Sequence, residues 1–153
     1  MKLDELERFI IEAKSNTYVA GGEHTASSRK GSHDLEYIGG DWTYLDSYFG
    51  GTDFVGQETV WFKEEPVWSM CYYGQILEPD EIDAQRAGET ILAALSAMYA
   101  QGRFLGGFSW SGPHGDYNDR STGDVSAFEG IECIKRGSKS LYKLRYFGGL
   151  IKP

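Results

Sequence analysis

Two glutamates, Glu58 and Glu132, are the residues of this sequence best placed to do chemistry. Each lies in a strand-like run, 54–60 and 128–134, in which alternate residues are Phe, Gly, Glu and then Val or Ile. Since alternate residues of a strand share one face, each carboxylate is expected on a face that is otherwise apolar. A carboxylate in such surroundings needs protonation, hydrogen bonds or a cation.

Aromatic side chains are expected on the same face as both glutamates. The candidate ligand-binding residues are Glu58, Glu132, Trp68, Tyr72, Tyr142 and Tyr146. Our functional hypothesis is a domain that binds or senses a small molecule, cationic or planar, between aromatic rings. Two alternatives stay open. The glutamates could be the general acid and base of an enzyme, or they could brace the sheet of a protein-interaction module. No catalytic residue is assigned.

The register of the second hairpin decides whether Glu132 joins the aromatic face. A three-residue bulged turn within 135–138 gives Glu132 the same facing as Tyr142 and Tyr146, whereas a two-residue turn at Gly137 and Ser138 reverses it. We expect the bulged turn, because Gly137 suits its left-handed position.

An internal repeat gives the chain its expected organisation. Residues 54–77 align without a gap with residues 128–151, an offset of 74 residues, and five of the 24 positions are identical. We therefore predict one domain over 1–153, built from two similar halves of about 1–78 and 79–153. The expected fold class is α+β, with two helix-plus-antiparallel-strand halves that form one curved antiparallel sheet and pack two helices against it. A cleft is expected between the halves.

The elements that position the glutamates follow from hydrophobic spacing. Helices are predicted over 3–14 and 80–100, the second capped by Asp80 and ended at Gly102. Strand-like runs are predicted at 35–38, 42–49, 54–62, 67–77, 125–134 and 141–151. Residues 15–34 are expected to form a long polar loop, and residues 103–124 are a Gly- and Ser-rich stretch without a predicted strand. Long loops often bind or cover a site, so Arg29, His33 and Asp34 are candidates for the mouth of the cleft.

Composition excludes several classes of protein. The 153 residues include 41 % hydrophobic and 25 % charged side chains, which is typical of a folded globular domain. The net charge of −8 argues against direct nucleic-acid binding. The sequence has no apolar run of 18 residues that could span a membrane, and residues 1–5 do not resemble the start of a signal peptide. The cytoplasm is therefore the expected compartment.

Metal and thiol chemistry is not expected. His24, His33 and His114 have no ligand-like spacing to one another or to the two cysteines. Cys71 and Cys133 lie in strand-like runs and are expected to be buried thiols. We predict no cofactor, and the sequence does not predict the oligomeric state.

Several motifs together carry a resemblance to a known family. They are Asn16-Thr17-Tyr18, Ser28-Arg29, Ser32-His33-Asp34-Leu35, Tyr44-Leu45-Asp46-Ser47-Tyr48, Phe54-Val55-Gly56-Gln57-Glu58 and Pro66-Val67-Trp68-Ser69-Met70. The chain resembles a bacterial and archaeal domain-of-unknown-function family. Its members occur alone or fused behind a helix-turn-helix segment of the XRE type in transcription regulators. The resemblance implies no activity and no catalytic residues, and a regulator role would need a separate DNA-binding partner.

The expected architecture is also similar to the effector-binding domains of multidrug-sensing transcription regulators. Those domains too have two similar halves and a glutamate among aromatic rings. This likeness concerns architecture alone and implies a binding function without naming a ligand.

Overall fold

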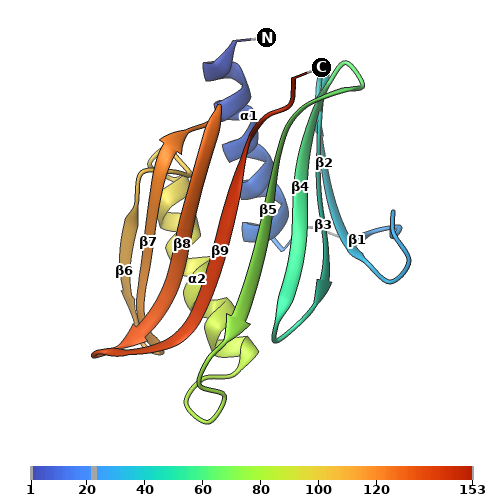
Figure 1. Cartoon of the computed structure of the whole chain (residues 1–153). Helices are drawn as coiled ribbons and strands as arrows, with labels where there is room; N and C mark the ends of the chain where they lie inside the picture. The colour runs from blue at the N-terminus through green and yellow to red at the C-terminus, as the bar shows by residue number, and fades with distance from the viewer. Residues whose placement is uncertain (1, 22–23, 153) are drawn as a thin grey trace.

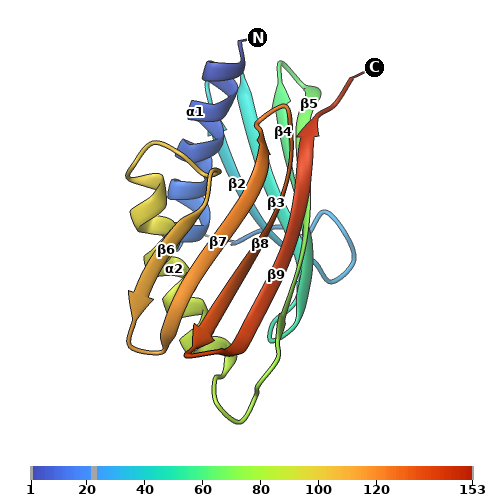
Figure 2. The same ribbon diagram turned by 60° about the vertical axis from the view of Figure 1, so that its left-hand side comes forward.

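A nine-stranded antiparallel sheet dominates the structure, a computed structural model that describes residues 2–21 and 24–152. Both α-helices, α1 (Leu3–Lys14) and α2 (Ala84–Tyr99), lie on the same side of this sheet, which curves around them (Figures 1 and 2). A short π-helix, η1 (Ser15–Val19), continues α1. The α+β class and the two helices on an antiparallel sheet are thus confirmed.

The strands run in the sheet order β1-β2-β3-β4-β5-β9-β8-β7-β6. Their bounds are β1 (His24–Thr25), β2 (His33–Gly39), β3 (Trp42–Gly50), β4 (Phe54–Phe62), β5 (Glu65–Ile76), β6 (Phe108–Gly112), β7 (Gly115–Asp124), β8 (Ala127–Arg136) and β9 (Lys139–Leu150). Strands β5 and β9 meet in the middle of the sheet and pair from Trp68 with Leu150 to Ile76 with Tyr142. The sheet therefore joins the two parts of the chain through its own backbone hydrogen bonds.

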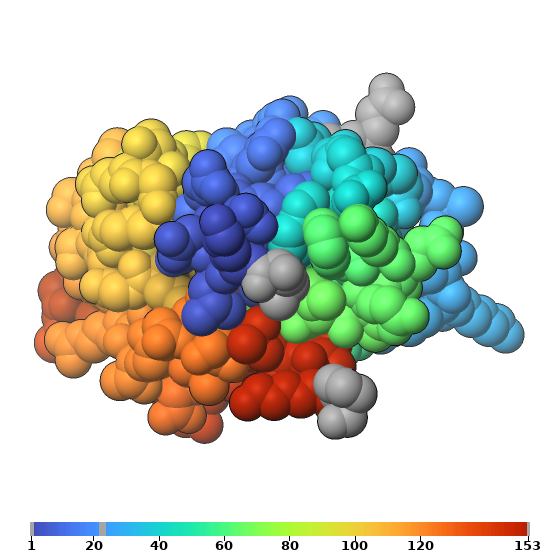
Figure 3. Space-filling view, turned by 90° about the horizontal axis from the view of Figure 1, so that it is seen from above, coloured from blue at the N-terminus to red at the C-terminus, as the bar shows by residue number. Residues whose placement is uncertain are grey.

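The core lies between the helices and the concave face of the sheet. Helix α1 buries Leu6, Ile10 and Ala13, whose spacing places them on one face of a helix. Helix α2 buries residues with the same kind of spacing, Ala87, Ile91, Ala94 and Met98. Seen from above, α1 lies between the cyan and green strands and the yellow and orange segments (Figure 3). None of the described helices has the length and apolar character needed to cross a membrane.

The second hairpin differs from its prediction in the turn but not in the facing of Glu132. Arg136 pairs with Lys139, so Gly137 and Ser138 form a two-residue turn, and the predicted bulged turn is wrong. A register shift between Ile134 and Lys135 restores the facing, because Glu132 lies opposite Leu144. The bulge that we predicted in the turn thus lies between the paired strands β8 and β9, two to three residues before the turn.

Two segments predicted without regular structure contain strands. Residues 15–34 hold η1, β1 and the start of β2, although residues 22–23 of this segment lie outside the described part of the chain. Residues 103–124 hold β6 and β7, whose Gly, Ser and Asp residues disfavour strands. Strand β7 pairs with β8 along nine residue pairs, from Asp116 with Lys135 to Asp124 with Ala127, so sheet pairing overrides the local preference.

The second helix starts later than predicted. Asp83, not Asp80, is its N-cap, and the Asp83 side chain accepts a 2.8 Å hydrogen bond from the backbone N–H of Arg86. Gly102 has the predicted left-handed conformation, with φ of 72°, just beyond the end of the helix.

Candidate functional site

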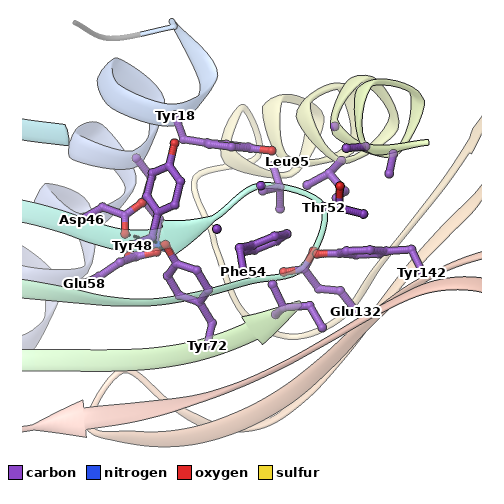
Figure 4. A pocket seen from close by; sticks show the side chains of 18 of the residues that line it. Tyr18, Asp46, Tyr48, Thr52, Phe54, Glu58, Tyr72, Leu95, Glu132 and Tyr142 are labelled. Atoms are coloured by element: carbon purple, nitrogen blue, oxygen red, sulfur yellow. Dashed lines mark hydrogen bonds and ion pairs between the residues drawn. The ribbon is translucent and has the colours of Figure 1, made fainter. Parts of the chain in front are cut away.

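A cleft of about 300 Å³ lies between the concave face of the sheet and the helical layer formed by η1 and α2. Both parts of the chain line it, with Tyr18 from η1, Tyr48 from β3, Phe54 from β4, Leu95 from α2 and Tyr142 from β9 (Figure 4). A hollow of about 30 Å³ adjoins it, and Lys14 and Glu132 line both. The site combines apolar walls with buried ionisable groups.

Four of the six predicted ligand-binding residues line the cleft. They are Glu58, Tyr72, Glu132 and Tyr142. Tyr146 lies against the smaller hollow instead. Trp68 lines neither space. Its ring is fully buried, stacks on Phe128, and donates a 3.0 Å hydrogen bond from Nε1 to the carbonyl of Val125. The ligand role predicted for Trp68 is corrected to a core role, because a Trp with a satisfied N–H completes the packing between β5 and β8.

The predicted residues at the cleft mouth do not line the cleft. Arg29 donates to the carbonyl of Ser47 on β3, and its guanidinium lies over the ring of Phe49. Asp34 is buried and accepts hydrogen bonds from the Ser28 amide at 2.8 Å and the Ser47 hydroxyl at 2.7 Å. His33 is exposed and packs near the ring of Tyr48. Arg29 and Asp34 attach the 27–34 segment to β3 through hydrogen bonds to Ser47, and His33 adds a ring contact with Tyr48.

The first acidic cluster consists of Lys14, Asp46, Glu58 and Tyr72. Asp46 and Glu58 face each other across the β3–β4 ladder. The Lys14 ammonium lies 2.7 Å from Glu58 Oε1 and 2.5 Å from Oε2, and both side chains are 8 % exposed. The Tyr72 hydroxyl donates a 2.7 Å hydrogen bond to Asp46. Burial, and then the negative charge of Glu58, raises the pKa of Asp46 to about 7.

The second acidic cluster consists of Tyr117, Asp119, Glu132, Tyr142 and Tyr146. Asp119 and Glu132 face each other across the β7–β8 ladder, as Asp46 and Glu58 do across theirs. The Tyr146 hydroxyl donates a 2.7 Å hydrogen bond to Oδ1 of Asp119. Burial, and then the negative charge of Asp119, raises the pKa of Glu132 to about 7, and burial also raises the pKa of Asp119.

Unpartnered polar atoms gather in the second acidic cluster. Among the described residues, no hydrogen-bond partner is found for Asp119 Oδ2, Glu132 Oε2 and the hydroxyl of Tyr142. The Tyr117 hydroxyl is near enough to Glu132 to oppose the rise in the pKa of that carboxyl group. Buried polar atoms normally have partners, and leaving one without a partner costs about 1–3 kcal/mol. The first cluster differs because Lys14 takes up both oxygens of Glu58.

Negative charge exceeds positive charge in this region. The two hollows are lined by the carboxyl groups Asp46, Glu58, Asp119 and Glu132, and Lys14 is the only Lys or Arg among the described residues that line them. Full ionisation of all four carboxyl groups in low dielectric would be costly, which explains why two of them have a pKa of about 7. The site can therefore gain either protons or one further cation.

Lys14, Asp46, Tyr117 and Asp119 were missed from the sequence. A signal existed for Lys14, which follows Leu6 and Ile10 at four-residue steps on the buried face of α1. Asp46 alternates with Tyr44 along β3, so strand parity alone would have turned it inward. Asp119 lies in β7, which the sequence did not predict as a strand. Among the described residues, no group of three His, Cys, Asp or Glu side chains is arranged to hold a metal ion.

The fold and site define an α+β domain with an acidic, aromatic-lined cleft beneath a curved antiparallel sheet. Residues 46–151 match a family described as a domain of unknown function, DUF5680. This match covers more than half of the chain, and the protein belongs to that family. No curated protein and no solved structure was found to match the chain.

Proposed function

We propose that this protein binds a small organic molecule, planar or cationic, in the cleft between its sheet and its helical layer. The observation that carries the proposal is the cleft itself, about 300 Å³ with apolar and aromatic walls and a few buried polar groups. Small-molecule sites have this composition, and roughly 300–1,000 Å³ is their usual size. The role that follows is that of a binding or sensing domain.

A glycine in the second turn of α2, Gly88, supports a cleft that is kept open. Gly88 lines the cleft, and a Cβ added to it would meet no atom within 4 Å. Glycine inside a helix costs about 1 kcal/mol relative to alanine. A residue that weakens its helix and leaves space beside the site fits a protein that has to admit a ligand there.

We propose further that the domain is built from two related halves, 1–78 and 79–153, with the cleft at their junction. Tyr72 of β5 pairs with Tyr146 of β9, and these tyrosines are equivalent in the 74-residue repeat. The register shifts of the two hairpins, after Val60 and after Ile134, are equivalent in the same way. A two-fold relation between the halves would place both acidic clusters around one space.

The proposed setting is the cytoplasm of a bacterium or archaeon, where the domain would act as the sensing part of a helix-turn-helix regulator. The resemblance of the motifs around Tyr44 and Glu58 to domains fused in that way supports this role. Another part of that regulator would contact DNA, since the net charge of −8 disfavours direct contact between these 153 residues and DNA.

Filling the cleft tests the proposal. The probe is alpha-naphthylmethanol, an uncharged aromatic alcohol, used beside its amine analogue alpha-naphthylmethylamine, and binding is measured by isothermal titration calorimetry. We expect at least one probe to bind the wild type and to lose at least tenfold in affinity in Gly88→Leu, because the leucine side chain enters the cleft.

The matched control is Gln85→Leu, which adds a similar side chain at an exposed position of α2 that does not line the cleft. This variant should bind as the wild type does. Absence of binding by both probes, or equal binding by wild type and Gly88→Leu, would overturn the proposal.

A further inference from the structure

We infer that the second acidic cluster is the subsite for an ammonium group, and that the natural ligand is a primary or secondary amine with a planar apolar body. The inference rests on the proposed function and adds the ligand's charge and orientation. The amine would donate N–H groups to Glu132 and to the neighbouring acceptors of the cluster. Its body would lie in the wider part of the cleft towards α2.

The unpartnered atoms are the first support. Glu132 and Tyr142 line a space that is large enough for a ligand, and Glu132 Oε2 and the Tyr142 hydroxyl are buried with no hydrogen-bond partner among the residues that the structure describes. The carboxyl groups offer several acceptor sites, and each tyrosine hydroxyl has only one proton to donate, so a ligand that brings further N–H donors fits this set. An ammonium group with two or three N–H bonds provides both the donors and the charge.

The unequal use of Lys14 is the second support. Its ammonium contacts both oxygens of Glu58, so that glutamate already has its cation. No Lys or Arg in the described part of the chain forms an ion pair with Glu132 or Asp119 within 4 Å. A positively charged ligand is therefore drawn to Glu132 and not to Glu58.

The shape of the cleft orients the ligand's body. Figure 4 shows Glu132, Phe54 and Tyr142 entering the cleft from the sheet, below the α2 residue Leu95. Phe54 and Tyr142 are stacked, with ring centroids 6.4 Å apart and an interplanar angle of 21°. A planar ring next to these two would leave its attached ammonium within the reach of Glu132.

Three probes with the same naphthyl body separate charge from shape. They are alpha-naphthylmethylamine, the uncharged alcohol alpha-naphthylmethanol, and the N,N,N-trimethyl derivative of the amine, which keeps the charge but has no N–H. At pH 8 the wild type is expected to bind the amine at least tenfold more tightly than the alcohol and than the trimethyl derivative. In Glu132→Gln the amine and the alcohol should bind within threefold of each other.

Proton linkage gives a second readout. Amine affinity should fall about tenfold from pH 8 to pH 6 in the wild type, because the amine then competes with a proton on a carboxyl group of pKa about 7. The profile should be flat in Glu132→Gln. The comparison is needed because Asp46 titrates in the same range. The groups that face or act on Glu132 from the elements packed around it are Lys14, Tyr18, Glu58, Tyr99, Tyr117, Asp119, Tyr142 and Tyr146.

Each outcome decides between the two claims. Glu129→Gln is the matched control, since Glu129 lies on the same strand and is exposed, and it should keep the amine preference. An alcohol that binds as tightly as the amine in the wild type would overturn the ammonium subsite and leave the cleft proposal standing. An amine preference that survives in Glu132→Gln, or equal binding of amine and trimethyl derivative, would also overturn it. If no probe binds, both proposals fail.

Discussion

The two acidic clusters have the same core arrangement and opposite electrostatic outcomes. Each has an Asp and a Glu on neighbouring strands and a tyrosine that donates a 2.7 Å hydrogen bond to the Asp. In the first cluster Lys14 neutralises Glu58 from α1. In the second cluster Glu132 has no such partner among the described residues and has a pKa of about 7.

This difference separates a carboxylate that stabilises the fold from one that is free to bind a cation. A buried ion pair is part of the folded core, because removing either partner leaves a charge without compensation. A buried carboxyl group that lacks a cation is a cost to the folded protein, and it is retained where it serves another purpose. We therefore propose that Glu58 braces the sheet and that Glu132 binds the ligand.

The largest expected effect comes from removing the cation of the first cluster. Lys14→Met keeps an unbranched apolar stem but leaves Glu58 without its partner, and we expect it to lower the free energy of unfolding by about 3–5 kcal/mol at pH 7. Urea denaturation followed by circular dichroism measures this. Lys63→Met is the control, since Lys63 forms an exposed pair with Asp41 and should cost less than about 1 kcal/mol. A loss in Lys14→Met as small as in the control would remove the distinction between the clusters.

In the second cluster, removing the charge is expected to stabilise the protein. A carboxyl group whose pKa is raised on folding contributes stability at low pH that is lost as the pH rises through the folded-state pKa, here about 7. Glu132→Gln does not ionise, so we expect it to be more stable than wild type by about 1–3 kcal/mol at pH 8 and nearly equal at pH 5. Asp46 titrates in both proteins, and its contribution cancels in the difference. Urea denaturation at both pH values measures this difference, with Glu129→Gln as the control. A Glu132→Gln variant that is less stable than the wild type at pH 8 would contradict the account.

The smallest effect concerns the feature that both clusters share. Tyr72→Phe and Tyr146→Phe each remove one 2.7 Å hydrogen bond to an aspartate, and each should cost about 1–2 kcal/mol. The two losses should agree to within about 0.5 kcal/mol in the same denaturation experiment. A much larger loss for one of them would mean that the two hydrogen bonds are not equivalent, and the comparison of the clusters would need revision.

Sequence reasoning reached the α+β class and the facing of Glu58, because strand alternation and helical spacing depend on local patterns. The predicted facing of Glu132 is confirmed, but the bulged turn from which it was predicted is wrong, and a register shift after Ile134 produces that facing instead. It did not reach β6 and β7, whose composition disfavours strands and whose pairing with β8 is a long-range effect. The sequence analysis also placed Trp68 in the site. Strand alternation predicts which face of the sheet a ring lies on, but it does not predict where along that face the cleft lies. The burial of Lys14 could have been predicted, because helical spacing alone places it on the buried face of α1.

The titration of Glu132 itself tests the central claim most directly. Its side-chain carboxyl signal can be followed by carbon NMR between pH 4 and pH 9 and assigned by its loss in Glu132→Gln. We predict a midpoint near pH 7 for the protein alone, and a lower midpoint when alpha-naphthylmethylamine is added, because the ammonium stabilises the ionised form. A midpoint near 4.5, the ordinary value for glutamate, unchanged by the amine, would contradict the account.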